Sequence, residues 1–252
     1  MIYCLISNAG KRVITDDSRE GRIIDSINSP LSRLSDDIKD YIDKTKNEQV
    51  RSERFSAYTS LLCGLKTFYG IDNFSIKRTD RGKPYIVTNE ADENNSNGDK
   101  KIYISVSHSD GLSAVALTNE GEIGVDIQSL IEPDRAERVD KRFLSELSFE
   151  DGELDLITYF LRMDGEVASV EENTVPLLKA SIPQKNDSSL SNKNNAEIIT
   201  SKWTLAESCM KAIGGGFSDL EILKNRGKNI ISGLRKIDLE IPYYLAISII
   251  KK

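Results

Sequence analysis

The most regular alternation of apolar and polar residues lies in the middle of the chain. In residues 101–108 an apolar residue at every second position alternates with tyrosine and serine, which is the period of a strand with one buried face. The Asp110-Gly111 pair is a strong hairpin signal, so residues 112–118 are predicted to return as its second strand. Residues 123–128 predict a further strand with an apolar face and a face of Gly, Asp and Gln.

Helical spacing of apolar residues marks other parts of the chain. It is clearest in residues 51–69, where Gly70 then provides a typical helix end. Residues 30–44 and 134–147 predict shorter helices, and residues 202–213 predict one that three glycines terminate.

The remaining segments complete an α+β pattern. Residues 2–7 predict a first strand and residues 230–250 predict closing strands, so helices and antiparallel strands follow one another in mixed order. Residues 90–100 and 185–195 are rich in Asn, Ser, Asp and Lys, which is too polar to bury, and we expect mobile loops there.

Composition narrows the classes of protein. The 252 residues suffice for one large domain or two small ones, and their net charge of −6 argues against non-specific nucleic-acid binding. No apolar run approaches the roughly 18 residues that cross a bilayer, and the apolar start of the chain lacks the basic leader of a signal peptide. Three dispersed cysteines form no CxxC pair. We therefore expect a cytoplasmic protein that contacts neither nucleic acid nor membrane.

Two acidic residues stand where they could hold a hard cation. Asp126 lies on a predicted strand with Gln128 on the same face, and Glu207 lies on the predicted helix 202–213. Mg²⁺ prefers one or two carboxylates together with phosphate oxygens and water. Taken alone, each acid is equally explained as a hydrogen-bonding or solvent-exposed side chain.

The helix that carries Glu207 also carries a lysine on the same face. Trp203, Glu207 and Lys211 are four residues apart, so they lie above one another along the helix. The pair could be an exposed salt bridge. It could also face one ligand, with the ammonium neutralising charge that develops on a phosphate.

Further candidates precede the acids in the chain. Ser107 and His108 end a predicted strand, and His108 is the only histidine available for imidazole chemistry. Arg81-Gly82-Lys83-Pro84 combines charge with a turn, which can present amides and a lysine to a phosphate or a planar base. An ordinary structural histidine and an ordinary turn explain these residues as well.

The order of these signals resembles the motif series of Sfp-type 4'-phosphopantetheinyl transferases. The segments RGKPYI, SVSHSDGLSAVAL, GVDIQ and WTLAESCMKAIG are similar to the family's GKP, (F/I)SxSH, GxDIE and WxxKEAxxKxxG motifs, in the same order across about residues 51–216. The helix around Arg54 resembles the family's arginine-bearing first long helix. The GVDI and WxxxExxxKxxG pair is the more specific part of this match.

The resemblance implies two similar α/β halves packed as a pseudo-dimer, with coenzyme A in the cleft between them. The halves would be residues 1–120, contacting the 3'-phosphate and adenine, and residues 121–252, carrying the metal-binding acids and the catalytic helix. A mobile insertion is expected at about residues 164–199. We expect a monomer that acts on a carrier protein.

The resemblance also implies roles for individual residues. Asp126, Gln128 and Glu207 would hold Mg²⁺, and Glu207 and Lys211 would be catalytic. The implied contacts to coenzyme A come from Arg54, Gly82, Lys83, Pro84, Ser107, His108 and Lys211. His108 and Arg54 would lie at the 3'-phosphate, and Gly82 to Pro84 at the adenine.

The implied activity is transfer of 4'-phosphopantetheine from coenzyme A to a serine of an acyl or peptidyl carrier protein, as in fatty acid, polyketide or nonribosomal peptide biosynthesis. Two departures leave an alternative open: Gln128 replaces the family's usual Glu, and Ala206 replaces a usual Lys. A non-catalytic relative that binds coenzyme A or a carrier protein would tolerate both. A magnesium-dependent phosphoesterase could use the same acids, although the ordered motif series counts against it.

Overall fold

A computed structural model gives the architecture of most of the chain. It describes residues 1–9, 36–72, 74–88, 101–139, 153–161, 167–176, 192–216 and 230–251. The described helices are α2 (Asp36–Asp43), α3 (Glu48–Tyr69), α4 (Pro133–Val139) and α5 (Asn192–Ile213). The described strands are β1 (Ile2–Asn8), β2 (Phe74–Arg78), β3 (Pro84–Thr88), β4 (Ile102–Ser109), β5 (Leu112–Thr118), β6 (Gly121–Ser129), β7 (Glu153–Leu161), β8 (Val167–Pro176), β9 (Ile230–Ile237) and β10 (Tyr243–Lys251).

The described strands form two sheets. One has the order β2-β3-β4-β5-β1-β7-β8 and the other has the order β6-β10-β9. Every pair is antiparallel except β1 with β7, which run parallel. The predicted α+β class is therefore confirmed.

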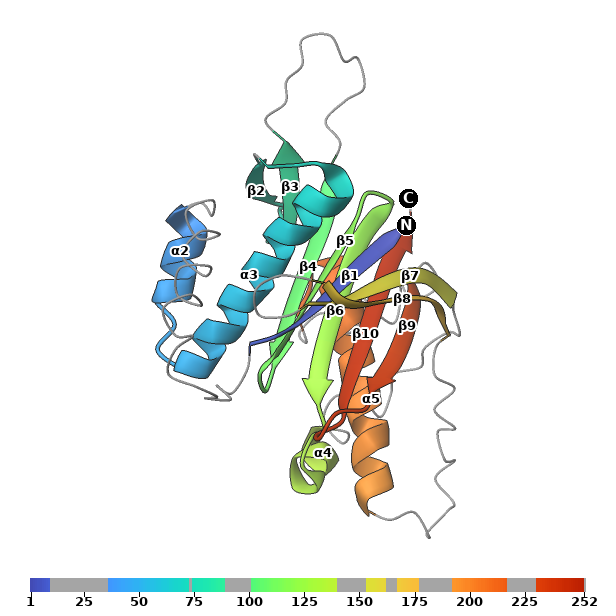
Figure 1. Ribbon diagram of the computed structural model, residues 1–252. Helices are drawn as coiled ribbons and strands as arrows, with labels where there is room; N and C mark the ends of the chain where they lie inside the picture. The colour runs from blue at the N-terminus through green and yellow to red at the C-terminus, as the bar shows by residue number, and fades with distance from the viewer. Residues whose placement is uncertain are drawn as a thin grey trace.

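The two sheets pack face to face, and a long helix covers each outer face (Figure 1). Alternate residues of β1 explain this order, because Cys4 packs toward β6 and β10 whereas Leu5 packs against α3. On the far side of the smaller sheet, Leu205 of α5 packs on Tyr244 and Ala246 of β10. The layers thus run α3, larger sheet, smaller sheet, α5.

Strand β4 is buried on both faces near its start. The alternation in residues 101–108 predicted one exposed face, and this prediction is wrong, because Tyr103, Ser105 and Ser107 are all buried. The smaller sheet covers that face: the Ser105 hydroxyl accepts a hydrogen bond from the backbone N–H of Val125 on β6 (3.0 Å). Serine tolerates such burial only because its hydroxyl finds a partner.

Helix α3 has clear signals at both ends. The side chain of Asn47 accepts a hydrogen bond from the backbone N–H of Val50, which starts the helix three residues before the predicted position. Gly70 adopts a left-handed conformation (φ 67°) and ends it as predicted.

Helix α5 starts earlier than its apolar spacing predicted, at Asn192 instead of residue 202. Residues 192–199 of the expected insertion and loop therefore belong to a helix, and residues 167–176 form β8. Outside the described residues lie the rest of that insertion and the loop predicted for residues 90–100. The start of the helix predicted for residues 30–44 and the end of the helix predicted for residues 134–147 lie outside them as well.

The described helices include none that is both long and apolar enough to cross a bilayer.

Gly124 on β6 sets how closely α5 approaches the smaller sheet. A Cβ atom there would overlap the carbonyl oxygen of Ser208 and lie 2.5 Å from the backbone nitrogen of Ala212. Only a residue without a side chain allows this contact. The close approach brings Glu207 and Lys211 of α5 toward Asp126, two residues further along β6.

We predict that Gly124→Ala lowers the free energy of unfolding by at least about 3 kcal/mol, because backbone atoms of α5 cannot yield as a side chain would. Urea denaturation would measure this. Gly216→Ala is the matched control, since no atom lies within 4 Å of its added Cβ, and it should change stability by less than about 1 kcal/mol. Equal effects of the two variants would contradict the assigned contact.

Candidate functional site

Asp126, Ser107 and Lys211 form a polar cluster where β4, β6 and α5 meet. The Asp126 side chain is only 5 % exposed. Its Oδ1 atom accepts hydrogen bonds from the Ser107 hydroxyl (2.7 Å) and from the Lys211 ammonium (2.8 Å). Lys211 also donates to the Ser107 hydroxyl (3.0 Å). Oδ2 of Asp126 is buried without a hydrogen-bond partner.

Glu207 completes this cluster from the preceding turn of α5. Its Oε2 lies 3.9 Å from the Lys211 ammonium, so both predicted acids lie beside one lysine. Burial raises the pKa of Glu207, the neighbouring Asp126 charge raises it further, and Lys211 opposes both. A carboxylate of raised pKa is suited to accept a proton near neutral pH.

The residues of this cluster fit a hard divalent cation. A buried carboxylate oxygen without a partner is costly, and a cation bound to Oδ2 of Asp126 would remove that cost. Among the described residues no group of three or more His, Cys, Asp or Glu side chains gathers. Mg²⁺ does not need one, since it binds one or two carboxylates and takes its other ligands from phosphate and water.

Gln128, the third predicted metal ligand, is engaged next to this cluster. Its side-chain amide donates to the Ser109 hydroxyl and to the Ser129 carbonyl oxygen, both at 3.2 Å. The bond to Ser109 joins the ends of β4 and β6. The ligand role of Gln128 stays a prediction.

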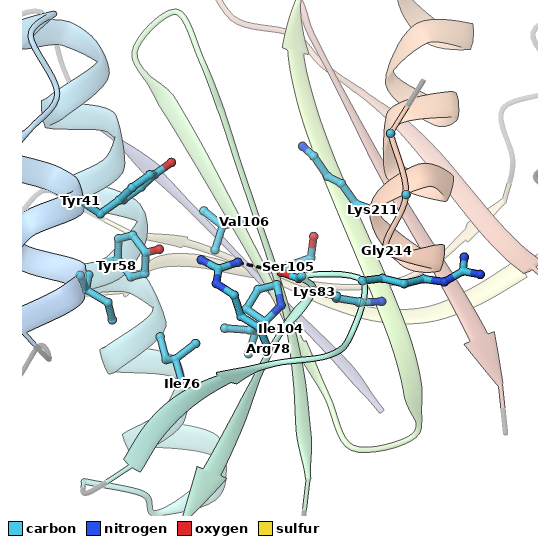
Figure 2. Close-up of a pocket in the computed structure, with 16 residues that line it drawn as sticks. Tyr41, Tyr58, Ile76, Arg78, Lys83, Ile104, Ser105, Val106, Lys211 and Gly214 are labelled. Atoms are coloured by element: carbon cyan, nitrogen blue, oxygen red, sulfur yellow. Dashed lines mark hydrogen bonds between the residues drawn. The ribbon is translucent and has the colours of Figure 1, made fainter. Parts of the chain in front are cut away.

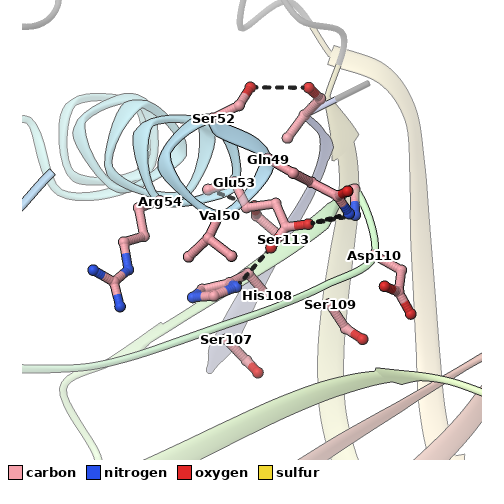
Figure 3. A network of polar contacts seen from close by, with 12 residues as sticks. Gln49, Val50, Ser52, Glu53, Arg54, Ser107, His108, Ser109, Asp110 and Ser113 are labelled. Atoms are coloured by element: carbon pink, nitrogen blue, oxygen red, sulfur yellow. Dashed lines mark hydrogen bonds and ion pairs between the residues drawn. The ribbon is translucent and has the colours of Figure 1, made fainter. Parts of the chain in front are cut away.

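His108 lies on the opposite face of β4 from Ser107 and pairs with a carboxylate that the sequence did not single out. Its Nδ1 atom lies 2.8 Å from Oε2 of Glu53 on α3 (Figure 3). A sequence signal for Glu53 did exist: it continues the spacing of buried α3 residues such as Ala57 and Leu61, which places a carboxylate on the core face.

Arg54 follows Glu53 on α3 and turns toward α2. Its guanidinium donates to the Thr45 hydroxyl (2.7 Å) and lies over the Tyr41 ring (4.2 Å to the centroid). Its Nε atom is buried without a partner. Arg54 and Tyr41 therefore form a cationic corner between α2 and α3.

A cavity of about 730 Å³ lies between α2, α3, the turn that joins β2 to β3, strand β4 and the end of α5. Figure 2 shows Tyr41 and Tyr58 on one side of it, with Lys211 and Gly214 on the other. Its wall includes Tyr41, Tyr58, Arg78, Arg81, Gly82, Lys83, Pro84, Val106 and Lys211.

The cavity is cationic. Among the described residues that line it, Arg78, Arg81, Lys83 and Lys211 are basic and none is acidic. Its two tyrosines and the apolar part of its wall supply surfaces for a flat ring or an aliphatic chain. Such a lining suits a ligand with several phosphates and an apolar part.

The predicted turn residues reach this cavity, but the Lys83 ammonium points elsewhere. It donates to the carbonyl oxygen of Ala212 at the end of α5 (2.5 Å), and Glu122 lies 4.0 Å away. A cation at a helix C-terminus is favourably placed. Lys83 therefore ties the turn to α5, while Gly82 (φ 80°) and Pro84 shape the wall.

The structure thus brings most predicted residues into two neighbouring groups. Ser107, Asp126 and Glu207 surround Lys211, and Lys211 also lines the cavity with Gly82, Lys83 and Pro84. Arg54 and His108 lie apart from the acids, on the α3 side of β4.

We predict that Lys83 makes stability depend on pH in alkaline solution. Burial lowers the pKa of Lys83 from its ordinary value of 10.5 to about 8, with Glu122 opposing the shift. Between pH 8 and pH 10.5 the Lys83 amine keeps its proton in the unfolded chain but not in the folded protein. The free energy of unfolding therefore rises with pH across this range. This gain in stability is lost as pH falls through 8.

Urea denaturation of the wild type and Lys83→Met across this pH range checks the assignment. The wild type should gain up to about 3 kcal/mol relative to Lys83→Met. Parallel pH profiles for the two proteins would contradict the burial of a charged lysine.

Comparison with known proteins adds no family to these observations. No protein-family model matches the chain. No curated protein matches it either. The function is therefore inferred from the geometry and charge of the site.

Proposed function

We propose that the chain transfers the 4'-phosphopantetheine group of coenzyme A to a serine of an acyl or peptidyl carrier protein. The observation that supports this proposal most directly is that Lys211 contacts the two acids and also lines the cavity. Its ammonium lies beside both Asp126 and Glu207, and its side chain also lines the 730 Å³ cationic cavity. A phosphate in the cavity would therefore lie next to the two acids.

The cavity supports coenzyme A as the ligand. Its size is within the range of small-molecule sites, roughly 300–1,000 Å³. Arg78, Arg81 and Lys211 can meet separate phosphates, and Tyr41 and Tyr58 offer faces for the adenine or the aliphatic arm. A ligand with three phosphates, a base and a long arm matches this lining.

The arrangement of layers supports a pseudo-dimer. Helices α3 and α5 have 22 residues each, and each covers one sheet. The proposed halves, residues 1–120 and 121–252, both line the cavity, through residues such as Val106 and Lys211. Strands β7 and β8 follow residue 120 but extend the larger sheet beside β1.

Asp126 and Glu207 would hold Mg²⁺, which when bound supplies positive charge to the diphosphate of coenzyme A and polarises it. Oδ2 of Asp126, buried and without a partner, is the oxygen best placed for this role. Lys211 would stay beside the diphosphate and stabilise the charge that develops on the leaving group.

In the proposed reaction the serine oxygen forms a bond to the β-phosphorus of coenzyme A. The bond between that phosphorus and the oxygen bridging to the α-phosphate breaks, and 3',5'-ADP leaves with the electron pair. Glu207 takes the serine proton, directly or through water, and burial and the Asp126 charge suit it to this by raising its pKa. Transfer of this kind needs positioning and charge neutralisation more than covalent help.

A non-catalytic binder of coenzyme A or of a carrier protein is the second candidate. One observation favours it: the Lys211 ammonium and the Ser107 hydroxyl already occupy Oδ1 of Asp126, and the Gln128 amide is engaged by Ser109. Such a protein would need the cationic cavity but not the acids.

Incubation with coenzyme A, Mg²⁺ and a panel of unmodified carrier proteins, followed by mass spectrometry, separates the candidates. We expect one carrier to gain a single phosphopantetheine group on serine. A binder would leave every carrier unchanged, and a phosphoesterase would release phosphate without modifying any of them. Coenzyme A bound without any mass gain would favour the second candidate.

We predict that Asp126→Asn and Glu207→Gln each lower the transfer rate by about 10²–10³-fold, because each removes a carboxylate that would hold the Mg²⁺ needed to neutralise the reacting diphosphate. Rates at saturating coenzyme A and limiting Mg²⁺ would measure this. Glu197→Gln is the matched control on the same helix, since Glu197 pairs with Lys236 instead. Near-wild-type rates in the two site variants would refute the metal assignment.

We predict that His108→Ala raises the KM for coenzyme A about 10-fold while kcat falls less than 3-fold, because His108 lies apart from the acids and binds a phosphate in both ground and transition states. Steady-state kinetics would show the split. A fall in kcat at unchanged KM would remove His108 from the binding site.

A further inference from the structure

Glu53 is a buried carboxylate that the proposed reaction does not use. Its side chain is 3 % exposed, in the core-facing stripe of α3. Oε1 accepts hydrogen bonds from the backbone N–H of Gly111 (2.6 Å) and from the Gln49 amide (3.1 Å), and Oε2 faces Nδ1 of His108 (2.8 Å). Both carboxylate oxygens therefore have partners.

These partners keep Glu53 ionised. Burial alone would raise the pKa of its carboxyl group, but the hydrogen bonds from His108, Gly111 and Gln49 outweigh burial and lower the pKa. An ionised carboxylate can only accept hydrogen bonds. The hydrogen between Glu53 and His108 must therefore lie on Nδ1 of the imidazole.

This contact determines which ring nitrogen His108 presents to a ligand. With Nδ1 bound to Glu53, Nε2 is the nitrogen left for other contacts, and the side chain is 27 % exposed. Histidines that bind metals are oriented in the same way, through a carboxylate on the second ring nitrogen.

The imidazole of His108 lies on the face of β4 that lines the cavity. His108 lies two residues after Val106 on the same face of β4, and Val106 lines the cavity. Figure 3 shows the imidazole of His108 and the guanidinium of Arg54 on the same side of the contact between α3 and β4. Tyr41, under that guanidinium, is also a lining residue.

We infer that Glu53 is a positioning residue, which accepts the Nδ1–H of His108 and directs Nε2 toward a phosphate of the bound ligand. In the neutral ring this contact selects the Nδ1–H tautomer. Beside a phosphate the ring carries a hydrogen on both nitrogens, so that Nε2–H donates to a phosphate oxygen. The identity of that ligand rests on the proposed function, whereas the tautomer does not. Residues 53 and 108 would then act as one unit, with only the imidazole touching the ligand.

A purely structural role for Glu53 predicts something different. Its bond to the Gly111 N–H anchors the hairpin between β4 and β5, and the Ser113 hydroxyl donates to its backbone carbonyl oxygen (2.7 Å). If anchoring were its only role, replacing Glu53 would lower stability without changing the tautomer of His108.

The chain contains one histidine, so ¹⁵N-labelled histidine gives a single imidazole to assign by long-range ¹H–¹⁵N correlation NMR. At a pH where the ring is neutral, we expect the wild type to be the Nδ1–H tautomer. Glu53→Gln should shift the population toward Nε2–H, and Gln49→Ala should not, because it leaves the carboxylate in place. A neutral wild-type ring with its hydrogen on Nε2 would overturn the inference without any variant.

Coenzyme A affinity tests the second half of the inference. Glu53→Gln should weaken binding about 10-fold, as loss of an orienting partner typically does. The double variant with His108→Ala should bind no more weakly than His108→Ala alone, because the two residues act together. If the losses of affinity in the two single variants added up in the double variant, or if Glu53→Gln bound coenzyme A as tightly as the wild type, the positioning role would be contradicted.

The two measurements keep this inference separate from the proposed function. Wild-type protein with the expected tautomer but no measurable affinity for coenzyme A would refute coenzyme A as the ligand and, with it, the direction of Nε2 toward its phosphate. Strong affinity with the other tautomer would refute the role of Glu53 and leave the proposed function intact.

Discussion

The close contact of α5 with β6 at Gly124 is the constraint on which the site depends. Backbone atoms of Ser208 and Ala212 fill the space where a side chain would stand. Glu207 and Lys211 directly precede these two residues on α5, so the same contact brings them to the strand. The Lys211 ammonium lies 2.8 Å from Oδ1 of Asp126 and 3.9 Å from Oε2 of Glu207. A larger residue at position 124 would move Glu207 and Lys211 together away from Asp126, because the helix moves as a rigid element.

Two buried carboxylates show how the fold tolerates charge in its interior. Glu53 has three hydrogen-bond partners shared between its two oxygens, and its pKa is lowered although it is buried. Asp126 has two partners on one oxygen and none on the other. The first carboxylate is satisfied by the protein alone, whereas the second keeps an oxygen that only a further donor or cation would satisfy.

The sequence predicts much of this arrangement because its periodic signals are local. Strand spacing placed Asp126 opposite an apolar face, and helical spacing placed Glu207 and Lys211 on one stripe, which the structure bears out. Burial of Ser105 and the pairing of β1 with β7 depend on segments distant in the chain, so no local pattern revealed them. The spacing of Glu53 places it on the core face of α3, but its role was missed because the histidine that pairs with it lies 55 positions away in the chain.

In the proposed function, the charges of the two groups would favour binding of a cation and a phosphate together. Around Lys211, the carboxylates of Asp126 and ionised Glu207 outnumber the ammonium, so this end of the site carries net negative charge. The cavity wall also carries Arg78 and Arg81, which attract phosphate. A phosphate spanning both would meet repulsion at the acids unless a divalent cation lay between them. Each proposed ligand would therefore lower the electrostatic cost of binding the other, and such a coupling is reciprocal.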